Sequence, residues 1–259
     1  MADNIMIEGP LAGPNYLVET RSVIGGRADQ EDCGYLCTNR DGLFAVLCDG
    51  MGGLADGALA SKAAAASMRN SYANYIMAGA KDNSQFLYRA MMCADRAVTA
   101  RFAGKAGTTL VAVVISERGM NWVSVGDSRL YIMRSGELLQ VTRDHNYRLW
   151  LDEMLQIGRI NSEQYTLEID RGSALISYIG KGSINLFDLT QNEFILEPHD
   201  IMLLATDGLF NMLAWDDLGS ILKLPLSLAQ KADQLIHSGS DRDNISAQDN
   251  TSFIMVEAL

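Results

Sequence analysis

Carboxylates stand at the ends of predicted buried strands at five places in this chain. Asp49 follows the apolar run 44–48, and Asp207 follows the apolar run 201–205. Each of these two aspartates is followed by a glycine, which lets another backbone approach closely. The other three places are Glu31-Asp32, Asp127 and Asp249.

An Asp-Gly pair taken alone is an ordinary turn signal. Several partly buried carboxylates at one edge repel one another and must be paired or neutralised. The sequence offers few lysines and arginines near them, whereas hard divalent cations prefer oxygen ligands. The pattern therefore predicts a site for Mn²⁺ or Mg²⁺, in which several shared carboxylates could hold two ions and the Gly50 carbonyl could be a further ligand.

The hydrophobic pattern of the elements that must position these acids changes its period along the chain. Strand patterns at 16–24, 35–38 and 44–48 precede two long helices, one after Gly57 and one over 84–102. Short strands are predicted at 108–115, 121–125, 130–133, 138–142, 175–178, 184–189, 193–196 and 201–205. A helix with loop over 146–160, helices near 215–222 and 227–238 and a last strand at 251–256 complete the pattern. This order is not a βαβ alternation, so it predicts an α+β fold of antiparallel sheets covered by helices.

Length and composition exclude several classes. The 259 residues contain no repeat and no Pro/Ser linker, so we expect one domain over 1–259. The formal net charge of −11 argues against nucleic acid and against an anionic membrane as partners. The N-terminus lacks a secretory pattern, and the four cysteines lack a second Cys/His pair that would complete a zinc site. We therefore expect a cytoplasmic protein with free thiols at Cys33, Cys37, Cys48 and Cys93.

Seven short motifs, in their order along the chain, resemble the metal-dependent Ser/Thr protein phosphatases of the 2C type, the PPM family, and bacterial members in particular. The motifs are Arg27-x-x-x-Glu31-Asp32, Asp49-Gly50-Met51-Gly52-Gly53-x-x-x-Gly57, Gly107-Thr108-Thr109, Val125-Gly126-Asp127-Ser128-Arg129, Thr142-x-Asp144-His145, Thr206-Asp207-Gly208 and Asp249-Asn250-x-Ser252. The resemblance covers residue 16 to the C-terminus. It implies a four-layer α-β-β-α sandwich, with two antiparallel sheets face to face and helix pairs outside.

The resemblance also implies roles for single residues. Asp49 would bridge two Mn²⁺ or Mg²⁺ ions, and Asp207 would bind one of them. Arg27 would bind the substrate phosphate, as its guanidinium fork suits. Glu31 and the Gly50 carbonyl would bind one ion, and Asp249 would bind the other together with Asp207. Asp127 and Asp207 would bind a weaker third ion, and Asp32 would orient its neighbours.

The implied reaction is hydrolysis of phosphoserine and phosphothreonine monoesters on proteins by a water activated between two ions. The implied partners are phosphorylated proteins and an opposing Ser/Thr kinase, with the phosphatase acting as a monomer. Residues 146–178, here called the flap segment, resemble a segment beside the active site, and they select substrates or form an ordinary surface insertion. His145 is interpreted as a structural turn residue.

Three departures from the family pattern stand out. Met51 stands where eukaryotic relatives often have a histidine proposed as general acid, so the leaving group must take its proton from metal-bound water or from another group. Asn211 replaces an acid that many relatives carry four residues after Asp207. Asp243-Asn244-Ile245-Ser246 repeats the Asp-Asn-x-Ser pattern, and we prefer Asp249 because a hydrophobic strand follows it directly.

Two alternatives remain open from sequence alone. A catalytically inactive 2C-type fold would act as a binding or signalling module, but such proteins lose metal ligands, and all five main acidic positions are present here. A different metal-dependent phosphoesterase, such as a nuclease, would need a basic groove for its substrate, which the charge of −11 does not favour.

Overall fold

Two β-sheets packed face to face form the centre of the protein in a computed structural model, which describes residues 4–13, 15–39, 42–52, 56–240 and 249–259. The first sheet contains β1 (Ile5–Glu8), β3 (Asp32–Asn39), β4 (Gly42–Met51), β5 (Gly107–Thr108), β6 (Leu110–Ser116), β7 (Gly119–Val125) and β10 (Asp188–Leu189). Its order is β1-β3-β4-β6-β7-β10, with β5 beside β4. The second contains β2 (Tyr16–Val23), β8 (Arg129–Arg134), β9 (Glu137–Gln140), β11 (Ile201–Ala205) and β12 (Thr251–Ala258), in the order β2-β12-β11-β8-β9.

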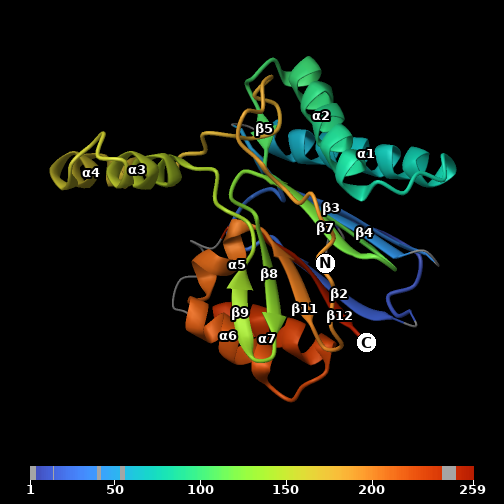
Figure 1. Ribbon diagram of the computed structural model, residues 1–259. Coiled ribbons are helices and arrows are strands. Elements are labelled where there is room, and N and C mark those ends of the chain that lie inside the picture. Colours follow the sequence, from blue (N-terminus) through green and yellow to red (C-terminus); the bar gives the residue numbers. More distant parts are fainter. Residues whose placement is uncertain (1–3, 14, 40–41, 53–55, 241–248) are drawn as a thin grey trace.

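Helices cover the outer face of each sheet, so the predicted four-layer α-β-β-α sandwich is confirmed (Figure 1). The helices α1 (Asp56–Met77) and α2 (Asn83–Phe102) lie on the first sheet. The helices α5 (Asp207–Met212), α6 (Trp215–Lys223) and α7 (Leu228–Ser240) lie on the second. Asp82 caps α2 by accepting a hydrogen bond from the Gln85 N–H at 2.8 Å, which fixes where this helix begins.

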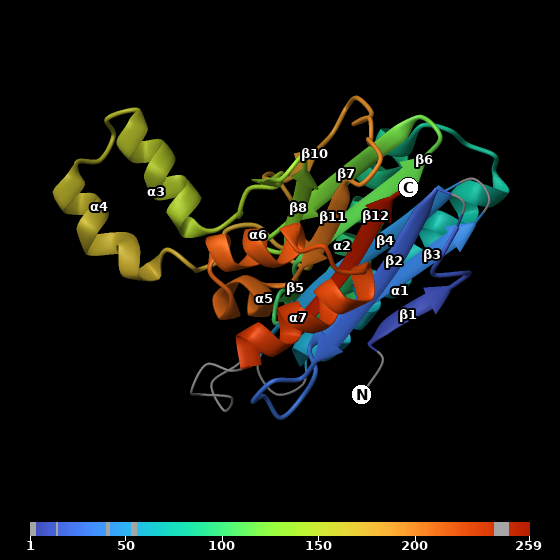
Figure 2. The same ribbon diagram turned by 90° about the horizontal axis from the view of Figure 1, so that it is seen from below.

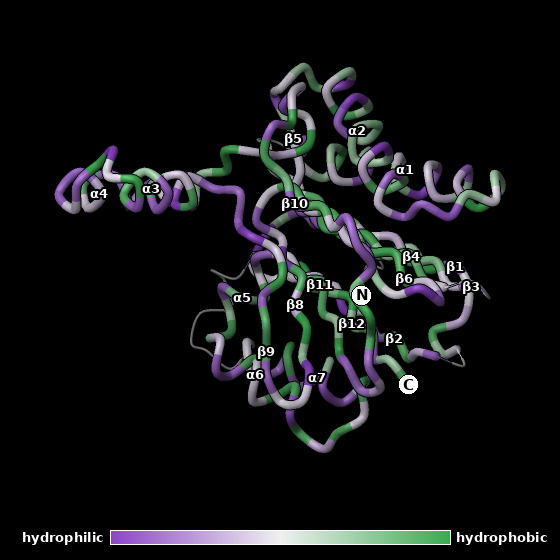
Figure 3. The backbone as a smooth tube through the Cα atoms, viewed as in Figure 1, coloured by the Kyte–Doolittle hydropathy of each residue, from purple (hydrophilic) through white to green (hydrophobic). Residues whose placement is uncertain are grey.

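The hydrophobic core has three layers that match the apolar runs of the sequence. The central layer between the sheets includes Leu47, Val111 and Leu204. A second layer, which includes Phe44 and Met68, lies under α1 and α2, and a third, which includes Leu209 and Phe253, lies under α5 to α7. Because β4, β6 and β11 are buried on both faces, they are nearly continuous apolar runs, as Figure 3 shows.

The flap segment stands away from the sandwich, and the two views of Figures 1 and 2 agree on this. It contains α3 (Tyr147–Gln156), α4 (Ser162–Glu168) and a 3-10 turn over Ile169–Arg171. Among these described residues α3 buries only Leu151, and α4 buries none. Asn146 and Leu175 pair in an isolated bridge where the segment leaves and rejoins the sandwich.

Several predicted elements are corrected by the structure. Strand β1 was not predicted, and it pairs parallel with β3, whereas the other strand pairs are antiparallel. The predicted strands 175–178 and 193–196 are reduced to single bridges at Leu175, Ile179 and Phe194, and 184–189 is reduced to β10. These segments run along the edge of the sheet, where only one side has a strand to pair with. The helix α5, which begins at Asp207, was also not predicted.

The predicted hairpin turns have the expected register. Ser135 and Gly136, with φ of 51° and 80°, connect β8 to β9 as a turn whose two central residues both have positive φ. Asn39 pairs with Gly42, although the two residues between them are outside the described chain. Gly53 and the second Asp-Asn-x-Ser copy at Asp243 also lie outside the described residues.

Candidate active site

The predicted acids lie at the end of the sandwich where the two sheets bring their strand ends together. Asp32 at the start of β3 pairs in register with Asp49 near the end of β4, so their Cβ atoms lie on the same face of the sheet. Asp207 begins α5 directly after β11, and Asp249 precedes β12. Because β11 pairs antiparallel with β12 and Ala205 faces Phe253, these two acids also lie at one edge.

Backbone contacts fix the strand ends that carry the acids. The Gly50 N–H donates to the Glu31 carbonyl at 3.2 Å, and the Thr109 N–H donates to the Asp49 carbonyl at 2.9 Å. The side chain of Asn250 accepts from the Glu31 N–H at 2.7 Å and donates to the carbonyls of residues 24 and 29. Asn250 therefore joins the loop that carries Arg27 and Glu31 to the start of β12.

A close approach to Gly57 determines where the Glu31 side chain lies. A Cβ atom at position 57 would collide with Glu31 Oε1, so any larger residue there would displace this carboxylate from its present position. Burial raises the pKa of Glu31, while Arg27 acts in the opposite direction. The spacing of the predicted second motif, which ends at Gly57, is thus explained by packing against the first motif.

Asp32 is buried beneath the other acids, with 1% of its surface exposed. Its Oδ2 accepts from the Thr206 hydroxyl at 2.9 Å, whereas its Oδ1 has no hydrogen-bond partner among the described residues. Burial raises the pKa of Asp32 to about 7, and the charges of Asp207 and Asp249 add to this effect. Asp32 Oδ1 is therefore buried near other acids without a hydrogen bond to any described residue, and burying an unpaired polar atom costs free energy.

Like charges around Asp49 oppose its ionisation. Burial raises the pKa of Asp49 well above its ordinary value, and Asp32, Asp207 and Asp127 raise it further. Burial and Asp249 likewise raise the pKa of Asp207, while hydrogen bonds to Asp49 and Asn211 lower it. The Asn211 amide donates to Asp207 Oδ2 at 3.1 Å, so the residue that replaces the family acid contacts Asp207 directly.

Asp127 lies in the loop between β7 and β8, half-buried and close to the same group of acids. Burial raises the pKa of Asp127 to about 7, with Asp207 and Asp144 raising it as well and Arg129 lowering it. Arg129 is held elsewhere, because it bonds Asp144 through two nitrogens at 2.8 and 2.7 Å. This cation therefore does not neutralise Asp127.

Arg27 is exposed at the rim of this group and bonds Asp249. Its Nη2 donates to Asp249 Oδ2 at 2.6 Å, which occupies one of the five N–H donors of the guanidinium. Met51 ends β4 beside these residues, and its thioether has no proton to donate. That the general acid is a group other than Met51 stays a prediction.

The carboxylates are assembled at one edge, but they do not yet converge on a point. Among the described residues, no group of three His, Cys, Asp or Glu side chains has the arrangement of a formed metal site. Three of the acids have hydrogen-bond partners that are not acids: Thr206 donates to Asp32, Asn211 donates to Asp207, and Arg27 donates to Asp249. The donor set still fits hard divalent cations, since it is all oxygen, largely desolvated and self-repelling.

Three helper residues were not given roles by the sequence. They are Thr206, which holds Asp32, Asn250, which holds Glu31, and Thr109, whose hydroxyl accepts from the Asp49 N–H at 2.9 Å. Each one stands inside or beside a quoted motif, so the motif pattern was the available signal. The cysteine prediction is confirmed, because Cys33, Cys37, Cys48 and Cys93 are all free. None of the helices in the described part of the chain is long and apolar enough to cross a bilayer.

Comparisons with known proteins agree with the fold and with the motif order. A sequence model of the family described as Protein phosphatase 2C matches residues 21–241. The serine/threonine phosphatase stp of Listeria welshimeri is 27% identical over 241 residues, which cover 89% of this chain and 91% of that protein. The protein phosphatase PhpP of Streptococcus pneumoniae serotype 2 is 26% identical over 238 residues, covering 89% and 92%.

Solved structures show the same arrangement. The serine/threonine phosphatase PstP/Ppp of Mycobacterium tuberculosis is similar with a TM-score of 0.74 and 25% identity, over 94% of this chain and 98% of that one. A PstP catalytic domain described as a complex with two manganese ions is similar with a TM-score of 0.72 and 25% identity, over 95% and 99%. Fold and motifs thus define the class of phosphatases to which these proteins are assigned. The chain belongs to the protein phosphatase 2C family, and it is a protein serine/threonine phosphatase.

Proposed function

We propose that this phosphatase uses two divalent cations, Mn²⁺ or Mg²⁺, held by the acids at the end of the sandwich where the strand ends of the two sheets come together. Asp49 would contact both ions, with Glu31 and the Gly50 carbonyl on one and Asp207 and Asp249 on the other. Asp127 and Asp207 would hold a weaker third ion. The two manganese ions described for the PstP catalytic domain support this assignment.

The observation that carries the proposal is the self-repulsion of the acids. Asp32, Asp49, Asp127 and Asp207 all have pKa values raised by burial and by one another, so the protein alone does not stabilise their charges. A group of ionised carboxylates would also repel an anionic phosphate ester. Bound cations would remove both costs, and they would lower the pKa of a water and screen charge developing on the phosphoryl group.

The chain's own residues would bind and orient the substrate. Arg27 is exposed and uses one donor on Asp249, so its remaining N–H groups would bind phosphoryl oxygens. Asp32, fixed by Thr206 from below, would orient Asp49 across the strand pair and would not touch the substrate. These two residues would therefore act on substrate binding and on site geometry, respectively.

We further propose the setting in which this reaction takes place. A single domain over 1–259 would act as a monomer in the cytoplasm on phosphorylated proteins, opposing a Ser/Thr kinase, with the flap segment beside the substrate. The four free thiols support a reducing compartment. The charge of −11 supports neither nucleic acid nor an anionic membrane as a partner.

The test is a comparison of Asp49→Asn and Asp207→Asn with Asp216→Asn, an exposed aspartate of α6. Hydrolysis of a phosphothreonine peptide and Mn²⁺ binding by calorimetry would be measured for each variant. We expect the first two to lose nearly all activity and to bind Mn²⁺ more weakly, with unchanged circular dichroism, while the control matches the wild type. Full activity of either site variant, or of the wild type in excess EDTA, would contradict the proposal.

A further inference from the structure

The loop that carries Asp127 is fastened to the base of the flap segment through one buried side chain, His145. No part of the His145 side chain is exposed. Its backbone N–H donates to the Gly126 carbonyl at 2.9 Å, and its ring Nδ1 accepts from the Gly126 N–H at 3.2 Å. His145 therefore holds the residue before Asp127 at two points.

The same residue also joins both ends of the flap segment. Its carbonyl accepts from the N–H groups of Ile176 at 3.0 Å and Ser177 at 3.3 Å, on the returning arm. The departing arm begins at the next residue, Asn146, whose side chain caps α3 through the Leu149 N–H. A displacement of either arm would therefore act on His145 first.

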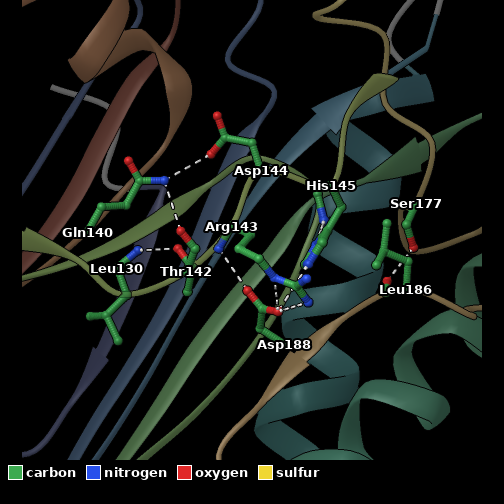
Figure 4. Close-up of polar contacts among 10 residues, drawn as sticks. Leu130, Gln140, Thr142, Arg143, Asp144, His145, Ser177, Leu186 and Asp188 are labelled. Carbon is green, nitrogen blue, oxygen red and sulfur yellow. Dashed lines mark hydrogen bonds and ion pairs between the residues drawn. The ribbon is translucent and has the colours of Figure 1, made fainter. Parts of the chain in front are cut away.

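Asp188 faces the ring of His145, and Figure 4 marks the ion-pair contact between the two side chains. Because Nδ1 accepts a hydrogen bond, the proton of the neutral ring is on Nε2, which faces Asp188 Oδ1 at 3.6 Å. Asp188 is itself held by the Arg143 N–H at 2.7 Å and by its guanidinium at 2.9 and 2.6 Å. Burial acts to raise the pKa of Asp188, but its contacts with His145 and Arg143 outweigh burial and lower that pKa, so an ionised carboxylate faces the ring.

The opposite side of the loop is packed against the residue that holds Asp49. Gly126 has φ of +97°, and a Cβ there would lie 2.7 Å from Thr109 Cγ2. Thr109 shares a hydrogen bond of 2.6 Å with Ser128 and accepts from the Asp49 N–H. Of the two neighbours of Asp127, Gly126 is thus held by His145 and packed against Thr109, and Ser128 is hydrogen-bonded to Thr109.

We propose that His145 is a positioning residue for Asp127, oriented by Asp188, which sets the Asp127 carboxylate relative to the base of the flap segment. The proposal rests on the proposed function, in which Asp127 binds the weaker third ion. His145 does not touch substrate or the reacting atoms; it acts through the Gly126 backbone. From sequence alone, His145 was interpreted as a structural turn residue of the Thr-x-Asp-His motif.

Three variants test the contacts of the two ring nitrogens of His145 one at a time. His145→Asn keeps an oxygen near Nδ1 for the Gly126 N–H, whereas His145→Gln places its amide nearer Nε2 and removes that acceptor. Asp188→Asn leaves the acceptor but removes the charge that faces Nε2–H. The measured quantity is the Mn²⁺ concentration that gives half-maximal hydrolysis of para-nitrophenyl phosphate, a substrate too small to need contacts with the flap segment.

We expect His145→Gln to raise this Mn²⁺ concentration about tenfold, because the buried Gly126 N–H loses its acceptor. His145→Asn should stay within about twofold of the wild type, and Asp188→Asn should shift about threefold in the same direction. A residue that only stabilises the fold would lower the melting temperature in all three variants without this ranking of Mn²⁺ dependence. If His145→Gln does not fold, the Mn²⁺ dependence of Asp188→Asn is compared with that of His145→Asn instead.

A double-mutant cycle with Asp127→Asn distinguishes the possible failures. If His145 acts through Asp127, adding His145→Gln to Asp127→Asn should change the Mn²⁺ dependence no further. An unchanged Mn²⁺ dependence for Asp127→Asn alone would contradict the third-ion role in the proposed function. A shift for Asp127→Asn together with none for His145→Gln, or with fully additive shifts, would overturn the positioning role.

Discussion

Replacing Asp127 by asparagine should make the ion-free phosphatase more stable while weakening its response to metal. Asp127 is half-buried, and its pKa of about 7 is raised by burial and by the charges of Asp207 and Asp144. In the unfolded chain the same carboxyl has an ordinary pKa of 3.8. The folded state therefore binds one proton more than the unfolded state between these two values.

The sign and the size follow from this difference in proton binding. Because the folded pKa is raised, the full stability is present below pH 3.8, and it is lost progressively as the pH rises from 3.8 through the folded pKa of about 7. At about 1.4 kcal/mol for each pH unit, a rise from 3.8 to about 7 corresponds to a loss of about 4 kcal/mol by pH 8. Asparagine carries no charge, so Asp127→Asn should recover this amount at pH 8 and almost none at pH 4.

The assay is urea unfolding in EDTA between pH 4 and pH 8, followed by tryptophan fluorescence. The free energy of unfolding of Asp127→Asn should exceed that of the wild type by a margin that grows with pH. Asp233→Asn is the matched control, since Asp233 is exposed and its ion pair with Arg21 should contribute less than about 1 kcal/mol. A difference between Asp127→Asn and wild type that is independent of pH, or that shrinks as the pH rises, would refute the reasoning.

Added Mn²⁺ should reverse the order of the two proteins. An ion that binds only the folded state stabilises it in proportion to the logarithm of its concentration over its Kd. With a ligand removed, Asp127→Asn should gain less stability than the wild type over the same Mn²⁺ titration at pH 8. Equal gains for the two proteins would show that Asp127 does not take part in ion binding.

Two further predictions concern arginines in different surroundings. Arg27→Ala should raise KM for a phosphothreonine peptide about tenfold or more, with an unchanged melting temperature. Arg27→Lys should restore only part of the wild-type KM, because lysine lacks the planar fork. If steady-state kinetics show an unchanged KM for both variants, Arg27 does not bind the phosphate. Arg134→Ala should cost about 3–5 kcal/mol of unfolding free energy in urea, since it leaves the buried carboxylate of Asp200 without its partner at 2.5 Å. Arg171→Ala, which breaks only an exposed pair, should cost less than about 1 kcal/mol, and similar losses for both arginines would contradict the burial argument.

The central strands could be predicted from sequence because their apolar runs are buried on both faces. The runs 44–48 and 201–205 became β4 and β11 with their acids at the expected ends. The segments 175–178 and 193–196 carry similar residue types, but they lie beside the sheet edge and form single bridges. Residue type alone does not reveal whether a neighbouring strand is available, which is a property of the complete topology.

Strand β1 was missed by the sequence prediction for a different reason. Its residues Ile5–Glu8 are too few to show an alternating pattern, and their parallel partner β3 is distant in the sequence. The register places Ile5 opposite Gly34, where the absence of a side chain leaves room for Ile5 at the sheet edge. Such a contact depends on two segments at once, so neither segment indicates it alone.

The acids of the site were predictable because motifs preserve their spacing, but their partners were not. Sequence reasoning placed Asp32 near Asp49, and the strand register confirms this neighbourhood. It did not foresee that Arg27 bonds Asp249 or that Thr206, which follows β11, donates to Asp32. Hydrogen bonds between residues that are far apart in the chain are set by the packing of the two sheets, which no single motif contains.

The narrow attachment of the flap segment makes it an exchangeable module. Asn146 and Leu175 face each other across one bridge, so the chain leaves and re-enters the sandwich at almost the same point. A two-residue turn spans such a gap, and the entropy of closing a longer loop there rises only slowly with its length. Residues 147–174 could therefore be shortened, lengthened or replaced by an unrelated small domain while the strands on either side keep their register. Insertions of different length and sequence between residues 146 and 175 should therefore leave the sandwich folded.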